Sequence, residues 1–351
     1  MLRSMANLNA LPAGMRRREF LATVAAVSAG AALLPPPLAA SETGRDRLGM
    51  VLPTRLLGKS GARVTAFCVG GHHIELRHTP AESQALIEKA LEVGCRFFDN
   101  AKSYNNGEAE RRYGEFLSPK YRDLVMIMTK TGAATAGEAR KDLDGAIGRM
   151  KCDYLDLWQI HHLRSPEDAE ARVRNGVLDV FLEAKRTGKA RRIGFTGHSN
   201  YQAHLRMLEL LKERGVELDT CQMPVNLCDP HYESFIVHVL PALLERGYGV
   251  LAMKTLAYGT MVGQSGFGRV PFANPPTRSG ITVRQMHEYV YSLPVAALVS
   301  GCTTSAEMEQ NASVLREFKG MEEVERKRLL SLSAPHAGAE LESYKSPPSP
   351  A

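Results

Sequence analysis

Four polar side chains suited to proton transfer stand at or just beyond the ends of short apolar runs: Asp99, Tyr104, Lys130 and His161. The run 95–98, for example, stops abruptly at Asp99, and Tyr104 follows in the loop beyond it. A short apolar run bounded by polar residues is typical of a buried strand. If such strands are parallel neighbours, their carboxyl ends meet at one rim and the four groups share one acid–base site. Taken alone, Asp99 is equally well explained by an ordinary strand-to-helix turn.

The rest of the chain supplies elements that would position such a site. Strand-like runs and helical patterns alternate eight times between residues 66 and 319. The expected strands are 66–70, 95–98, 124–129, 155–160, 192–195, 219–223, 249–253 and 297–300. The expected helices are 80–93, 108–117, 137–150, 167–187, 202–214, 232–246, 282–293 and 305–319. This alternation predicts an α/β fold in which eight parallel strands close into a (β/α)8 TIM barrel.

An open, doubly wound sheet is the competing fold. That fold usually carries a glycine-rich phosphate-binding turn after its first strand. Here the corresponding turn is Gly70-Gly71-His72-His73, which does not match that pattern. The barrel is therefore the favoured architecture.

Six motifs, in order, resemble the aldo-keto reductase family over residues 52–319. They are F-F-D-N-A-K-S-Y at 97–104 with G-E-A-E at 107–110, T-K at 129–130, L-D-L-W-Q-I-H at 155–161, I-G-F-T-G-H at 193–198, Q-M-P-V-N at 222–226 and G-V-L-A-M-K at 249–254. The resemblance implies a barrel closed at its bottom by a hairpin over 55–64. It also implies NAD(P)H-dependent interconversion of an aldehyde or ketone and the alcohol.

The resemblance assigns the four polar residues to catalysis, and their chemistry agrees with those roles. Tyr104 is expected to donate a proton to the carbonyl oxygen. A free phenol has a pKa of about 10, which is too high for easy proton transfer at neutral pH. The nearby Lys130 ammonium is expected to stabilise the phenolate and so lower the pKa of Tyr104. Asp99 would hold Lys130 in place, and His161 would hydrogen-bond the substrate oxygen. The adjacent His162 is expected to pack in a loop, because neighbouring side chains of a strand point to opposite faces.

The resemblance also implies a set of cofactor-binding residues: Gln222, Met253, Lys254, Gly301, Thr303, Ser305 and Asn311. Gln222 would hold the nicotinamide carboxamide, and Met253 would pack on the ring where many family members have an aromatic residue. Backbone N–H groups at the start of the last helix would suit a phosphate, although a plain helix cap explains that segment equally well. The adenine would contact Asn311.

The choice between NADP and NAD stays open at this stage. The family's usual 2′-phosphate cations correspond to Gly301 and Glu307. A carboxylate at position 307 would repel a phosphate, so NADH is a real option.

Residues 1–40 are predicted to be a twin-arginine signal peptide. Arg16-Arg17-Arg18-Glu19-Phe20-Leu21 carries the arginine pair, and the apolar run to residue 34 is too short for a stable membrane span. A small-residue cleavage site, Leu38-Ala39-Ala40, follows. The mature protein is thus expected in the periplasm or exported, and an uncut membrane anchor is the alternative.

The remaining segments complete the expected domain organisation. Residues 41–50 are predicted to be a linker, 51–320 the barrel, and 321–351 a partly disordered C-terminal extension. Residues 335–351 in particular are rich in Pro and Ser with few apolar side chains, so we expect no fixed structure there.

Composition limits the classes of partner. The 351-residue chain is 44% hydrophobic with a net charge of +6, of which the leader contributes +3 through four Arg and one Glu. This mild charge, without a basic stripe, argues against nucleic acid. The six cysteines lack C-x-x-C spacing and are expected to be buried thiols, with neither disulfides nor a metal site.

A small-molecule carbonyl compound is the expected partner, and the oligomeric state is left open. The alternative function is an exported nicotinamide-binding sensor or binding module with little turnover, since relatives of this family serve as channel-associated subunits. A barrel of unrelated hydrolase or isomerase type is permitted by the fold but not favoured by the ordered motifs.

Overall fold

The computed structural model describes residues 44–345, apart from 76–77 and 266–270. The predicted leader, residues 1–40, lies outside this part of the chain. Among the helices described, none is both long and apolar enough to cross a bilayer.

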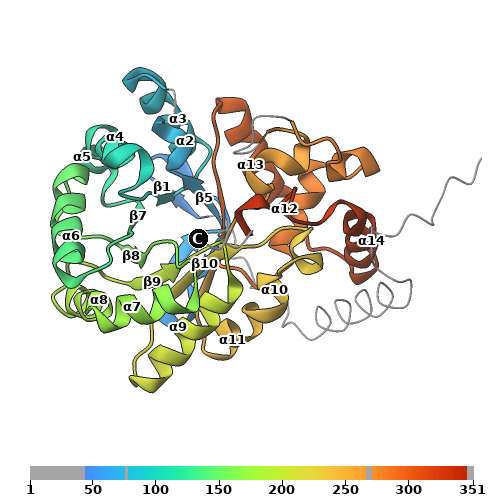
Figure 1. Cartoon of the computed structure of the whole chain (residues 1–351). Coiled ribbons are helices and arrows are strands. Elements are labelled where there is room, and N and C mark those ends of the chain that lie inside the picture. Colours follow the sequence, from blue (N-terminus) through green and yellow to red (C-terminus); the bar gives the residue numbers. More distant parts are fainter. Residues whose placement is uncertain (1–43, 76–77, 266–270, 346–351) are drawn as a thin grey trace, which may run out of the picture.

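Eight parallel strands close into a barrel, as the alternation in the sequence predicts (Figure 1). The strands are β5 (Phe67–Gly70), β6 (Phe97–Asp99), β7 (Met126–Thr131), β8 (Leu157–Ile160), β9 (Ile193–Thr196), β10 (Thr220–Pro224), β11 (Gly249–Met253) and β12 (Ala297–Ser300). Each strand pairs with the next in sequence, and β12 pairs with β5 to close the ring. The (β/α)8 prediction is confirmed.

Helices surround this ring. They are α2 (His72–Glu75), α3 (Pro80–Glu92), α4 (Glu108–Phe116), α5 (Ser118–Tyr121), α6 (Ala136–Met150), α7 (Pro166–Arg174), α8 (Val177–Arg186), α9 (Tyr201–Glu213), α10 (Phe235–His238), α11 (Leu240–Glu245), α12 (Val283–Tyr291), α13 (Ser305–Glu317) and α14 (Glu323–Ser333). The short 3-10 helices are η1 (Gly58–Ser60), η2 (Tyr104–Gly107), η3 (Asp229–His231), η4 (Ala257–Val262), η5 (Pro276–Ser279), η6 (Ala334–His336) and η7 (Ser343–Lys345). Capping boxes begin α3, α6 and α12.

Two of the predicted helices are each two helices, so those predictions were wrong. The expected helix 167–187 is α7 followed by α8, because Gly176 takes a φ of 77° that ends the first helix. The expected helix 232–246 is α10 followed by α11. Pro241 lacks the N–H that would continue the earlier helix, so the ladder breaks there.

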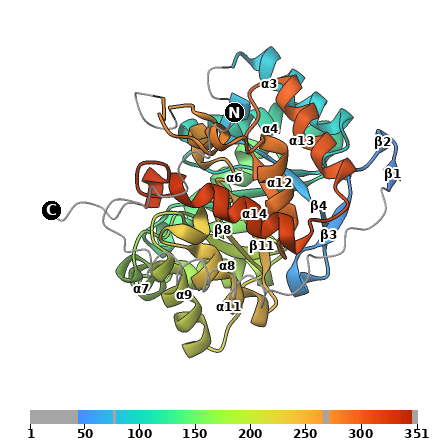
Figure 2. The same cartoon turned by 90° about the vertical axis from the view of Figure 1, so that its right-hand side faces the viewer.

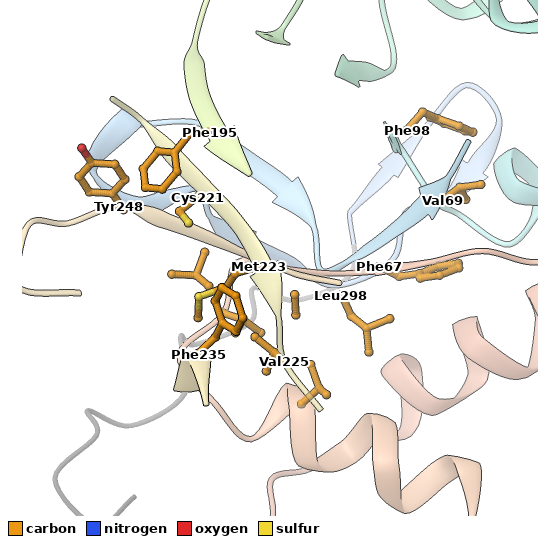
Figure 3. Close-up of a cluster of buried hydrophobic side chains, with 14 of the residues drawn as sticks. Phe67, Val69, Phe98, Phe195, Cys221, Met223, Val225, Phe235, Tyr248 and Leu298 are labelled. Carbon is orange, nitrogen blue, oxygen red and sulfur yellow. The ribbon is translucent and has the colours of Figure 1, made fainter. Parts of the chain in front are cut away.

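Alternation along the strands produces two separate apolar layers. Side chains such as Phe97, Met128 and Leu251 fill the barrel interior. Their neighbours in sequence point outward and pack against the helices. Figure 3 shows this outer layer, in which Phe67 and Val69 of β5 and Cys221 and Met223 of β10 repeat at a spacing of two residues.

An antiparallel hairpin, β3 (Thr54–Leu56) with β4 (Arg63–Thr65), closes the bottom of the barrel. Leu57 and Val64 contribute to the interior apolar cluster. Arg55 is buried and donates to the carbonyl oxygens of Tyr291 at 2.8 Å and Val295 at 3.0 Å. The predicted hairpin is therefore present, and its arginine fastens it to the segment that leads into β12.

The segment predicted as a linker, 41–50, contains structure of its own. The short strands β1 (Arg45–Asp46) and β2 (Gly49–Met50) pair antiparallel. The Asp46 carboxylate accepts from Arg96 at 2.6 Å and 3.0 Å, and this partner lowers the pKa of Asp46.

The prediction that residues 335–351 have no fixed structure was wrong for 335–345, which are ordered. Figure 2 shows α12, α13 and α14 together on one side of the barrel. Beyond α14 the chain turns inward, and Lys345 reaches a side-chain exposure of 0%. Its ammonium lies 2.6 Å from Asp229 and 3.0 Å from Glu342. Charge pairing, which composition does not reveal, fixes this polar segment.

Candidate active site

The alternation that fills the barrel also aims the candidate residues into its upper end. Asp99 lies two residues after the interior Phe97, and Lys130 lies two after the interior Met128. Each pair of residues therefore shares a face of its strand. In the same way, Met253 lies two residues after the interior Leu251 on β11.

Lys130 is the centre of a buried polar cluster. Its side chain is 1% exposed and forms an ion pair with the Asp99 carboxylate. The same ammonium donates to the Asn100 carbonyl oxygen at 2.7 Å and to the Tyr104 hydroxyl at 3.2 Å. Burial raises the pKa of Asp99, and the charge of Lys130 opposes that rise. The side chains of Asp99, Tyr104 and Lys130 therefore lie together, as expected from the sequence.

A sharp turn places Tyr104 over this cluster. Asn105 and Asn106 follow it with φ of 44° and 52°, in the left-handed region that Asn tolerates better than most residues. The expected lowering of the Tyr104 pKa was wrong: burial raises it well above 10, and the Asp99 charge adds to the rise. Tyr104 is therefore a neutral phenol. Its oxygen accepts from Lys130, and a hydrogen bond with Asp99 contributes to the raised pKa.

His161 stands beside Tyr104 at the end of β8. Its Nδ1 lies 3.3 Å from the Ser103 hydroxyl, and its ring centroid lies 6.0 Å from that of Tyr104. Burial, reinforced by the charge of Lys130, holds the pKa of His161 well below 6.5. The imidazole is neutral at physiological pH, so it can donate a hydrogen bond from one nitrogen and accept at the other.

These residues open onto one cavity of about 560 Å³ at the carboxyl ends of the strands. The predicted site residues that line it are Asp99, Tyr104, Lys130, His161, Gln222, Met253, Lys254, Gly301, Thr303 and Asn311. Ser305, the first residue of α13, is exposed and does not line the cavity. The structure therefore does not bring this one predicted residue to the site.

Two of the predicted cofactor residues are held by neighbours. The Gln222 carboxamide oxygen accepts from the Gln159 amide at 2.9 Å, which fixes the orientation of the side chain on β10. Asn311 donates to the Ser300 hydroxyl at 3.2 Å, on the other side of β11. The two amides thus mark separate ends of a cavity that spans three strand ends.

An acid stands at the α13 end of the cavity. The Glu307 carboxylate accepts from the backbone N–H of Thr303 at 2.7 Å and from its hydroxyl at 2.9 Å. It therefore occupies the turn where the family's 2′-phosphate cation would stand.

Histidines that the sequence analysis left out of the site also line the cavity. His72 and His73 belong to α2, directly after β5, and the His72 ring lies 5.2 Å from that of Tyr104. The His73 ring lies where a Cβ on Gly301 would stand, only 1.8 Å from its Nδ1, so a larger residue at 301 would displace this ring. The two consecutive histidines after the first strand were the available signal.

His162 lines the cavity as well, contrary to the expectation that it only packs in a loop. Its φ of 58° breaks the extended conformation on which the alternation argument rested. The ring packs against that of His198, with centroids 4.2 Å apart and planes tilted by 31°, and its Nε2 lies 3.0 Å from the Ser199 hydroxyl. The pKa of His162 falls to about 4 through burial and nearby arginines, so this ring too is neutral.

No group of three or more metal-ligating side chains is arranged around a common point within the described residues. All six cysteines, which lie in that part of the chain, are free thiols, five of them buried.

Comparison with known proteins shows the same family as the motifs do. The family model described as Aldo/keto reductase family matches residues 66–279. An uncharacterized oxidoreductase of Bacillus subtilis is 26% identical over 231 residues, covering 60% of this chain and 68% of that protein. The L-galactose dehydrogenase of Arabidopsis thaliana is 23% identical over 295 residues, covering 76% and 89%. The 6-dehydroglucose reductase of Novosphingobium aromaticivorans is 34% identical over 167 residues, but covers only 42% and 52%.

The solved structures agree on the fold. The aldo-keto reductase of Bacillus halodurans in its holo form superposes with a TM-score of 0.68 at 18% identity, covering 83% of this chain and 99% of the other. An aldo-keto reductase from Pseudomonas has a TM-score of 0.59 at 21% identity, covering 75% and 95%. At these identities the likeness establishes the barrel.

Proposed function

The chain belongs to the aldo/keto reductase family and is an NAD(P)-dependent oxidoreductase, and from that premise we propose that Tyr104 protonates the carbonyl oxygen of a small substrate. The observation that carries the assignment is the hydrogen bond from the Lys130 ammonium to the Tyr104 oxygen, at 3.2 Å. Tyr104 also lines the cavity, which puts its hydroxyl group within reach of a substrate bound there.

The residues present fit a nicotinamide cofactor. Gln222 is pinned by Gln159, so its amide group can hold a carboxamide. Gly301 lines the same cavity, with the His73 ring in the space that a side chain at position 301 would need. When bound, the cofactor supplies the hydride, and the protein supplies the orientation and the proton.

The four side chains then have distinct tasks. As the proton leaves Tyr104, negative charge grows on the phenol oxygen, and the Lys130 ammonium 3.2 Å away stabilises that charge. Asp99 fixes the ammonium through their ion pair. Neutral His161 donates a hydrogen bond to the substrate oxygen, which orients the carbonyl for both transfers. A phenol with a raised pKa stays loaded with its proton until a stronger base, the developing alkoxide, is present.

The pocket favours a polyhydroxylated, sugar-like carbonyl substrate. His72, His162 and His198 line the cavity, and burial lowers the pKa of each. A neutral imidazole has one donor and one acceptor, which matches a hydroxyl group that both donates and accepts. Two relatives named above act on sugars, as their names state: L-galactose dehydrogenase and 6-dehydroglucose reductase. Turnover of a panel of aldoses, ketoses and their dehydro derivatives, against apolar aldehydes of equal size, tests this proposal.

We also propose that NADH is the preferred cofactor, because Glu307 can accept from a ribose 2′-hydroxyl but repels a 2′-phosphate. Glu307→Gln keeps an acceptor for Thr303 while removing the charge. The expected result is about fivefold to tenfold tighter NADPH binding with little change for NADH, measured by fluorescence titration. Glu309→Gln is the matched control, since Glu309 lies on the same helix but does not line the cavity. Equal NADPH affinity in the parent and Glu307→Gln contradicts the assignment.

The export route remains a proposal based on residues 1–40. Replacing Arg17 and Arg18 together with lysine should leave the protein in the cytoplasm, because the arginine pair is the part of the signal that is recognised. Cell fractionation measures the outcome. Arg16→Lys serves as control because Arg16 precedes the pair. Unchanged export of the double variant would show that residues 1–40 are not a twin-arginine signal.

A further inference from the structure

Lys254 lines the cavity, and no carboxylate of the described residues forms an ion pair with it. It follows Met253, the last residue of β11, and takes a φ of 56°. Its ammonium lies 3.6 Å from the centroid of the Tyr258 ring. It forms no ion pair with any of the described residues, whereas Lys130 pairs with Asp99. A cation placed over an aromatic ring is attracted to it, but the ring does not neutralise its charge.

The protein groups around Lys254 disfavour its positive charge. Burial, together with the nearby Lys130 ammonium, lowers the pKa of Lys254 to about 7, and Asp99 opposes this only in part. The titratable groups that sense Lys254 across the cavity are His72, His73, His161, His162 and His198. Each of these is neutral or cationic, and Asp99 is already paired. The middle of the cavity is therefore suited to an anionic ligand group.

The order of the strands indicates which group of the ligand arrives there. Around the barrel, β11 lies between β10, which carries Gln222, and β12, which leads to Gly301. A dinucleotide that extends from Gln222 to Asn311 must cross the end of β11, where Lys254 stands. The middle of a dinucleotide is its diphosphate, which joins the two nucleoside halves and carries its negative charge.

We propose that Lys254 is a proton-linked receptor for the diphosphate: as the dinucleotide binds, Lys254 takes up a proton and exchanges the Tyr258 ring for that anion. This inference rests on the proposed function, because it uses the placement of the two nucleosides at Gln222 and Asn311. It adds a new property to that function: the affinity for the dinucleotide depends on pH near neutrality.

The sign of the dependence follows from the linkage. If binding of the dinucleotide raises the pKa of Lys254, the complex is favoured at low pH, where Lys254 is already protonated. The affinity then falls as the pH rises through the pKa that Lys254 has in the free protein. Because the pKa of Lys254 is about 7, the Kd for NADH should be about tenfold larger at pH 8 than at pH 6. Titration calorimetry in two buffers of different ionisation enthalpy should show uptake of a proton at pH 8. NADH is the probe because the 2′-phosphate of NADPH titrates near pH 6 itself, at a second pKa of about 6.

Two variants separate this role from general packing. Lys254→Arg keeps a permanent charge, so it should bind NADH tightly at both pH values and lose the pH dependence. Lys254→Met should bind at least tenfold more weakly at pH 6 and also lose the dependence. ADP-ribose, which has the diphosphate but no nicotinamide, should show the same pattern in all three proteins.

Some outcomes would overturn the inference. One is an affinity of wild-type protein for ADP-ribose that is constant from pH 6 to 8. Another is Lys254→Met with parental affinity for ADP-ribose but a raised KM for carboxylated substrates, which would assign the cation to the substrate. Either result leaves the proposed function intact if Tyr104→Phe still abolishes turnover, so the two failures are distinguishable.

Discussion

Tyr104→Phe should reduce carbonyl turnover by about 10²- to 10⁴-fold, the usual contribution of a positioned general acid. The substitution keeps the ring, and therefore its edge contact with His72 at 5.2 Å, but removes the hydroxyl that accepts from Lys130. Cofactor affinity should remain at the parental value, because Gln222, Lys254 and Asn311 are unchanged. Steady-state kinetics with a sugar-like carbonyl and NADH, together with fluorescence titration of NADH, measure the two quantities separately.

The matched control is Tyr201→Phe, which removes a hydroxyl from a tyrosine on α9 that stacks on His238 away from the cavity. Turnover of this control should equal that of the parent. If Tyr104→Phe also keeps near-parental turnover while binding NADH normally, Tyr104 is not the proton donor. The exported binding module then becomes the better account of the protein.

Lys345→Met should destabilise the fold by about 3–5 kcal/mol, the typical cost of breaking a buried ion pair from one side. The ammonium is fully buried between Asp229 and Glu342, and it also donates to the Tyr232 carbonyl oxygen at 2.8 Å. Without it, two buried carboxylates face each other with no cation. That loss is a large share of the roughly 5–15 kcal/mol that holds a domain together.

Urea unfolding followed by circular dichroism measures the change in free energy. Lys327→Met is the control, because Lys327 lies on α14 in the same extension and its side chain is 52% exposed. Its loss should change stability by less than about 1 kcal/mol. The double variant Lys345→Met with Glu342→Gln should be more stable than Lys345→Met alone, since one stranded charge is removed. A double variant no more stable than the single one would refute the electrostatic explanation.

The polar residues at strand ends could be predicted because a strand has a fixed period of two. Once Phe97 and Met128 are taken as interior residues, Asp99 and Lys130 must follow them into the barrel. The same rule failed at His162, whose φ of 58° takes it out of the extended region. A residue that leaves the strand conformation at the strand's last step has no periodicity from which its direction can be inferred.

Long-range charge pairing was beyond the reach of the sequence. The tail 335–345 has the composition of a mobile segment, yet Lys345 is fixed by Asp229, which lies 116 residues earlier. The pKa of Tyr104 was mispredicted for a related reason. The lysine that lowers a phenol pKa was visible in the sequence, but the degree of burial that raises it depends on every element around the cavity.

The arginine of the bottom hairpin has a consequence for how the chain is made. Arg55 donates to carbonyl oxygens 236 and 240 residues further along, and β5 completes its pairing only with β12. The hairpin and β5 lie at the start of the barrel sequence, and their partners lie at its end. The ribosome therefore synthesises the two groups far apart in time. Until β12 emerges, the edge of β5 stays open and Arg55 lacks its acceptors. Closure of the ring is therefore a late, non-local step, of the kind that slows folding, and it follows synthesis of nearly the whole barrel.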